Sequence, residues 1–143
     1  MSGMEFPGPV PEIPVRDITA AAAHYQDSLG FTLDWGGDEL GLAGISRGGC
    51  RLFLANEEHR KTHGTVGPTL TWLNLDSKQA VDELYLAWSA SHARVRSRPE
   101  SKPWGLYEFT VADLDGNLFR VFYDFTTPER AVIRTLDAEG EDV

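Results

Sequence analysis

The chain repeats one order of secondary structure twice, and this repeat limits its possible folds more than any other feature. Each half reads as an apolar strand, a capped helix, a second strand and a hairpin. Asp17 precedes the first helix and Asp76 precedes the second. The order predicts a single α+β domain over residues 9–125, built from two strand–helix–three-strand modules at about 9–55 and 68–125.

Local signals place the elements of each module. In the first module we expect a strand over residues 11–17, a helix over 20–29 capped by Asp17 or Thr19, a strand over 31–35 and a hairpin over 40–55. In the second we expect a strand over 69–76, a helix that opens at Asp76-Ser77 with Ala80, Leu84, Ala87 and Trp88 on its apolar face, a strand over 93–98 and a hairpin over 107–124. The stretch 56–67 reads as a polar loop, and residues 126–143 as an acidic tail.

The charge of the chain argues against nucleic acid and anionic membranes as partners. It has 13 Lys and Arg against 22 Asp and Glu, a formal net charge of −9. A field of that sign attracts cations, although the same charge also serves solubility alone. Cys50 is the single cysteine, and no apolar run approaches the ~18 residues of a membrane span. With no apolar leader at its start, the chain is expected to be cytoplasmic.

Three stretches of the chain resemble the bleomycin resistance proteins. Those proteins read G-x-x-E-F-x-V-x-D-x-x-G-N, V-R-R-G-x-x-R-L-x-x-S-x-x-E-H and W-I-x-V-x-D where this chain reads WGLYEFTVADLDGN, ISRGGCRLFLANEEH and TWLNLDS. They belong to the vicinal oxygen chelate superfamily, together with glyoxalase I and the extradiol dioxygenases. The resemblance covers about residues 9–125 and implies that the two modules form a cup-shaped mixed sheet.

The resemblance also implies four positions that hold a divalent metal in the metal-dependent members of the superfamily. Spacing places these positions at Val10, Phe53, Leu70 and Arg120. None of these side chains is a ligand for a divalent cation, and a guanidinium would repel one. A register error of one residue brings in no ligand, and an error of two brings in only Glu12. We therefore expect no metal, no cofactor and no catalysis.

Arg120 is unusual because it lies on an otherwise apolar strand, next to Phe119 and Val121. It is a permanent cation with five N–H donors and no acceptor. Two interpretations are open: it contacts a ligand, or it forms an ion pair inside the cup with Glu12 or Glu108.

Aromatic side chains provide the other candidates for ligand contact. Trp72 alternates with Leu70 and Asn74 on the face assigned to the cup, and Trp35 and Trp104 lie near its mouth, where they can stack on flat rings or simply pack at an edge. The complete set of candidate ligand-binding residues is Trp35, Phe53, Trp72, Trp104, Glu108 and Arg120. His59 and His63 are four residues apart, but their segment lacks helical periodicity and reads as a solvated loop.

The resemblance implies that the protein binds a ligand and does not catalyse a reaction. Bleomycin resistance proteins bind a bulky cationic antibiotic stoichiometrically, in a cleft shared by two subunits. We therefore expect a homodimer that binds a cationic, aromatic small molecule and sequesters it. Two alternatives remain open: a glyoxalase-like lyase or dioxygenase of the same fold, and a binding protein for another small aromatic metabolite.

Overall fold

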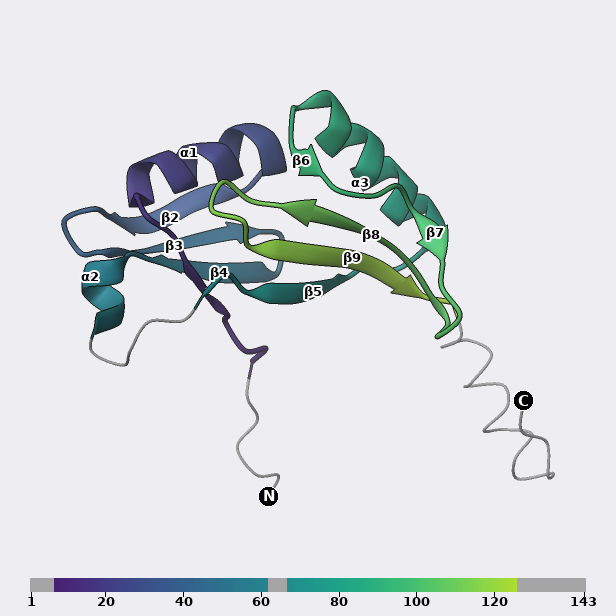
Figure 1. Ribbon diagram of the computed structural model, residues 1–143, viewed down its shortest axis with the longest axis horizontal. Helices are drawn as coiled ribbons and strands as arrows, with labels where there is room; N and C mark the ends of the chain where they lie inside the picture. Colours follow the sequence, from purple (N-terminus) through teal and green to yellow (C-terminus); the bar gives the residue numbers. More distant parts are fainter. Residues whose placement is uncertain (1–6, 62–66, 126–143) are drawn as a thin grey trace, which may run out of the picture. The chain divides into compact units, whose positions relative to one another are not determined.

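The computed structural model describes residues 7–61 and 67–125 (Figure 1). These residues form two compact units, which are described one at a time. The first unit holds the elements up to Thr69 and also residues 113–117, and the second holds residues 70–112 and the strand from Leu118 onward. The expected acidic tail at 126–143 and His63 lie outside the described residues.

The first unit contains a four-stranded mixed sheet in the order β1-β4-β3-β2. Its strands are β1 (Glu12–Pro14), β2 (Thr32–Gly37), β3 (Leu42–Arg47) and β4 (Cys50–Ala55). β1 is parallel to β4, and the other pairs are antiparallel. Helix α1 (Ile18–Leu29) packs on one face of this sheet (Figure 1), where Tyr25, Ile45 and Leu54 are buried.

Carboxylate side chains cap the N-terminus of α1, and a glycine ends the helix. The Asp17 carboxylate accepts a hydrogen bond from the backbone N–H of Ala20 at 3.0 Å, as the sequence predicts. The carboxylate of Asp38 accepts a further bond from the N–H of Ile18 at 3.0 Å. Gly30 ends the helix with a φ of 77°, in the left-handed region that favours glycine.

The second unit contains the sheet order β5-β9-β8-β6, with β7 also paired to β8. Its elements are β5 (Leu70–Asn74), α3 (Lys78–Ala90), β6 (Arg94–Val95), β7 (Glu100–Ser101), β8 (Leu106–Ala112) and β9 (Leu118–Asp124). β5 is parallel to β9, and the remaining pairs are antiparallel. Two mixed sheets, each with a helix on one face, confirm the expected α+β class.

The turn between β8 and β9 is organised around Asp113, whose side chain is fully buried in the first unit. One carboxylate oxygen accepts the backbone N–H groups of Asp115 and Asn117, each at 2.8 Å. The other accepts the hydroxyl of Tyr25 at 2.8 Å and the side-chain amide of Asn117 at 2.9 Å. Because four donors satisfy this carboxylate, the D-x-D-G-N turn has a structural role here.

Three local predictions differ from the structure. The stretch expected as a loop contains one short helix, α2 (Glu57–Arg60), because the Asn56 side chain accepts the N–H of His59 and caps a helical turn. On α3 the buried residues are Val81 and Trp88, whereas Ala87 is exposed. The strand expected over 93–98 is confined to β6, and a second short strand, β7, follows before the expected hairpin.

Helices in the described part of the chain are all too short, or too polar, to span a membrane.

Candidate functional site

Four of the six predicted ligand-binding residues belong to the second unit, and the strand register places three of them on one face of its sheet. Trp72 on β5 is paired with Arg120 on β9, and Arg120 is paired with Thr110 on β8. Glu108 lies two residues before Thr110 and therefore points to the same side. The alternate residue Phe109 packs against Tyr85 and Trp88 of α3, so these side chains occupy the face away from the helix.

Arg120 lies against an aromatic ring on this open face. Its guanidinium carbon is 5.1 Å from the centroid of the Trp72 ring, a cation–π distance. The Trp72 ring in turn meets the edge of Phe122, with centroids 5.6 Å apart. Within the described residues Arg120 forms no ion pair with Glu108, and its buried Nε atom has no hydrogen-bond acceptor. Of the two partners considered for a structural ion pair, Glu108 therefore does not provide one.

Glu108 instead anchors Trp104. The indole N–H of Trp104 donates to Oε2 of Glu108 at 3.1 Å. Glu108 is only 4% exposed, whereas Trp104 is 54% exposed. Trp104 follows β7 in a tight turn in which the N–H of Gly105 donates to the carbonyl of Lys102. The result is an exposed aromatic ring that a buried carboxylate holds in one orientation.

These side chains border a cavity of about 100 Å³. It is lined by Ser97, Lys102, Trp104, Glu108, Thr110 and Arg120. The ammonium of Lys102 is paired with the carboxylate of Glu100, which lowers the pKa of that carboxyl. Arg120 is therefore the cation at this cavity without a carboxylate partner among the described residues.

An interruption of the edge strand contributes to this cavity. Val95 is paired with Val111, and Glu100 with Glu108, so the four residues 96–99 lie opposite the two residues between Glu108 and Val111. The Ser97 hydroxyl accepts the backbone N–H of Thr110 at 3.1 Å, in place of a backbone carbonyl. Sequence reasoning missed Ser97 because it predicted an unbroken strand over residues 93–98, and it found no signal that singled out Lys102 or Thr110.

The other two predicted residues, Trp35 and Phe53, lie together in the first unit. Their ring centroids are 5.3 Å apart, in an edge-to-face arrangement. The Trp35 ring lies over Gly44, where an added Cβ would be 2.3 Å from its Nε1 atom. Arg51 adds a cation–π contact, 5.8 Å from the centroid of the Phe53 ring. The predicted set is therefore divided into an aromatic pair in the first unit and a polar–aromatic cluster in the second.

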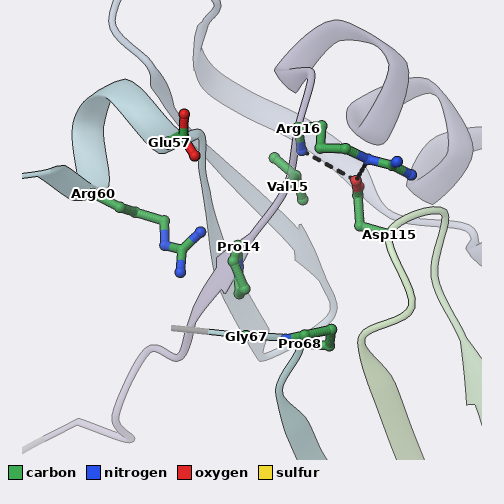
Figure 2. Close-up of a pocket in the computed structure, with 8 residues that line it drawn as sticks. All are labelled: Pro14, Val15, Arg16, Glu57, Arg60, Gly67, Pro68 and Asp115. Atoms are coloured by element: carbon green, nitrogen blue, oxygen red, sulfur yellow. Dashed lines mark hydrogen bonds and ion pairs between the residues drawn. The ribbon is translucent and has the colours of Figure 1, made fainter. Parts of the chain in front are cut away.

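A larger cavity of about 450 Å³ lies elsewhere in the first unit (Figure 2). It is lined by Pro14, Val15, Arg16, Glu57, Arg60, Gly67, Pro68 and Asp115. The Asp115 carboxylate accepts the backbone N–H of Arg16 at 3.1 Å and its Nε–H at 2.9 Å. None of the six predicted residues lines this cavity.

The positions that hold a metal in related proteins do not fit one here. Phe53 is paired with Glu12, Arg120 with Trp72, and Leu70 with Leu118. Apart from Glu12 these side chains are aromatic, aliphatic or cationic, and a single carboxylate does not form a metal site. No group of three or more His, Cys, Asp or Glu suited to a metal occurs in residues 7–61 and 67–125. The absence of a metal stays a prediction.

Comparisons with known proteins are consistent with this architecture. A crystal structure of lactoylglutathione lyase from Agrobacterium tumefaciens is 22% identical, with a TM-score of 0.71 over 84% of this chain and 96% of that chain. A crystal structure of a glyoxalase/bleomycin resistance protein/dioxygenase from Nocardioides is 21% identical, with a TM-score of 0.69 over 87% of this chain and 88% of that chain. A crystal structure of a bleomycin-binding protein complexed with bleomycin is 23% identical, with a TM-score of 0.64 over 81% of this chain and 97% of that chain.

At these identities the three structures show a shared fold and nothing finer. No match was found among curated proteins. The family described as the glyoxalase/bleomycin resistance protein/dioxygenase superfamily matches residues 10–121, which is most of the chain. Two mixed sheets, the repeated module and this match together show that the chain belongs to the glyoxalase/bleomycin resistance protein/dioxygenase superfamily.

Proposed function

We propose that this protein binds a bulky, cationic antibiotic of the bleomycin type and sequesters it without changing it chemically. The observation that carries the proposal is the pair formed by Trp104 and Glu108. An exposed indole held in place by a buried carboxylate is a preorganised surface for a flat ring, because the free protein has already lost the side-chain freedom that binding would otherwise remove. Trp72, 42% exposed on the same sheet, is a second ring available for stacking.

The charge of the chain supports a cationic ligand. A net charge of −9 raises the local concentration of cations and speeds their encounter with the protein. The structurally similar bleomycin-binding protein was crystallised with bleomycin, so the fold accommodates a ligand of this kind in at least one relative.

The protein is also proposed to form a homodimer. The sheet faces away from the helices carry exposed apolar side chains, Trp35 in the first unit and Leu70 and Trp72 in the second. Exposed apolar patches of this kind commonly mark protein or ligand contacts, and two-fold pairing of identical chains is the commonest way to cover them.

The proposal is tested by titrating the protein with bleomycin, phleomycin and tallysomycin. A ligand that binds only the folded state raises the melting temperature by mass action, and stacking quenches tryptophan fluorescence. Trp104→Ala should weaken binding, whereas Trp104→Phe should retain part of the affinity because it keeps a ring but loses the bond to Glu108. Leu86→Ala, an exposed change on α3, is the matched control.

If none of the three drugs changes the melting temperature or the fluorescence at concentrations far above micromolar, the antibiotic proposal fails. Binding of another small aromatic compound at the same residues would then support the alternative of a metabolite-binding protein.

A further inference from the structure

We propose that the cavity between Arg120 and Glu108 recognises a primary carboxamide edge of the ligand, that is, a C=O and an N–H side by side. The inference rests on the proposed function, because it takes the open face of the second sheet as the ligand site. It adds the chemical group that this site selects.

The two charged side chains are arranged as diagonal neighbours. Glu108 on β8 is paired with Phe122 of β9, and Arg120 lies two residues before Phe122 on the same face. Diagonal neighbours of an antiparallel pair are roughly 7–8 Å apart at the backbone, close enough for both side chains to reach one small group. The described ion pairs include none between Arg120 and Glu108, and both residues line the same cavity.

Each of the two side chains is held by a different aromatic residue. Glu108 is buried and accepts the indole N–H of Trp104 through Oε2. The Arg120 guanidinium lies over the Trp72 ring, a contact that uses none of its N–H donors in hydrogen bonds. The cavity therefore presents hydrogen-bond donors on one side and a carboxylate acceptor on the other.

A carboxamide matches this arrangement better than a charged group does. Its carbonyl oxygen accepts from Arg120 while its N–H donates to Glu108, and both bonds involve a charged protein group, the stronger kind. A ligand carboxylate would be attracted by Arg120 but repelled by Glu108. A ligand ammonium would be attracted by Glu108 but repelled by Arg120. The cavity of about 100 Å³ has room for a group of this size, since one water occupies ~30 Å³ of liquid.

The test uses three probes that share one ring system: naphthamide, naphthoate and naphthylmethylamine. Binding is followed by two-dimensional amide NMR, in which the indole N–H signals of Trp72 and Trp104 report the site and those of Trp35 and Trp88 serve as internal references. In the native protein naphthamide should bind about tenfold more tightly than either charged probe, and it should shift the Trp104 indole signal.

Two variants reverse the preference in different ways. Glu108→Gln keeps the size and the acceptor for Trp104 but removes the negative charge, so naphthoate should gain about tenfold and overtake naphthylmethylamine. Arg120→Met keeps the length but removes the donors, so naphthamide should lose about tenfold while naphthylmethylamine gains. Dispersed amide spectra establish that each variant is folded. If one variant does not fold, the other variant still tests the proposal.

Equal binding of the three probes to the native protein would overturn the proposal, as would unchanged affinity for naphthamide in Arg120→Met. If bleomycin shifts the Trp104 signal while the probes show no preference, the carboxamide inference fails and the proposed function stands. If neither bleomycin nor any probe perturbs Trp104, both fail.

Discussion

The guanidinium of Arg120 lies over the Trp72 ring, 5.1 Å from its centroid, on adjacent parallel strands of the second sheet. This contact explains how a permanent cation is accommodated on an apolar strand. The ring quadrupole stabilises the charge, at a scale of about 0.5–2 kcal/mol, without neutralising it or occupying its N–H donors. Arg120 is therefore held in place and still able to bind an acceptor.

Replacement of Trp72 by alanine tests the role of the open face. Because Trp72 is 42% exposed but supports the charge of Arg120 and contacts Phe122, Trp72→Ala should lower the melting temperature by a few degrees and leave the protein folded. It should weaken bleomycin binding by about 1–3 kcal/mol, the scale for loss of an aromatic anchor. Leu86→Ala, an exposed change on α3, is the control, and isothermal calorimetry measures both. If Trp72→Ala unfolds the protein, Trp72 is part of the core and Trp104 becomes the principal stacking residue.

Gly44→Ala tests the aromatic pair of the first unit. An added Cβ would lie 2.3 Å from Nε1 of Trp35, so the ring must move away from its place beside Phe53. We expect a loss of about 1 kcal/mol in unfolding free energy, at the low end of the cost of overpacking, because the half-exposed ring can move toward solvent. A changed indole N–H signal of Trp35 should accompany it. Gly49→Ala, where a Cβ meets nothing within 4 Å, is the matched control. An unchanged Trp35 signal in Gly44→Ala would contradict the packing described here.

Tyrosine ionisation should destabilise the protein at high pH. Burial, and then the neighbouring carboxylate of Asp113, raise the pKa of Tyr25 well above its usual 10.0. A hydrogen bond to Asp82 raises the pKa of Tyr107 to about 12. Since the folded state retains protons that the unfolded state loses, the stability that these tyrosines contribute is complete below about pH 10 and declines as the pH rises further.

Urea unfolding at several pH values between 8 and about 11 measures this decline. Tyr25→Phe should be less stable than the native protein at neutral pH, because it loses a hydrogen bond to a buried carboxylate. It should also show a shallower fall above pH 10. A fall as steep as that of the native protein would mean that Tyr25 does not carry the effect.

The purified protein should contain no stoichiometric zinc, iron, nickel or manganese, because Phe53, Leu70 and Arg120 have no ligating group. Elemental analysis of protein expressed in metal-supplemented medium is the measurement. Addition of these metals should give no turnover of the methylglyoxal–glutathione hemithioacetal. About one metal per chain, or any such turnover, would support the lyase or dioxygenase alternative.

Light scattering at micromolar concentration should give a mass of about twice the 15.8 kDa of one chain. The physical reason is that each unit exposes apolar side chains on the sheet face away from its helix, Trp35 in the first unit and Leu70 and Trp72 in the second. The change Leu70→Ser should shift the equilibrium toward the monomer. A native protein that is monomeric under these conditions would argue against a cleft shared by two subunits.

Much of the fold could be predicted because its signals are local. Asp17 and Ser77 cap the two long helices through their own side chains, each bonding to the N–H three residues ahead. Gly48-Gly49 forms the two-residue turn between β3 and β4, and Gly48 has the positive φ of 58° that such a turn requires. These features depend on residues close in sequence, so a single chain segment is enough to recognise them.

The site depended on relationships that no local pattern contains. The sequence identified Trp72, Trp104, Glu108 and Arg120 one at a time, but only the register of β5 and β9 placed Arg120 on Trp72, and only the turn between β7 and β8 placed Trp104 on Glu108. The interruption between β6 and β7, which adds Ser97 to the cavity, follows from how the edge strand pairs with β8. Strand register is set by packing across the whole sheet, and that packing is a property of the tertiary structure.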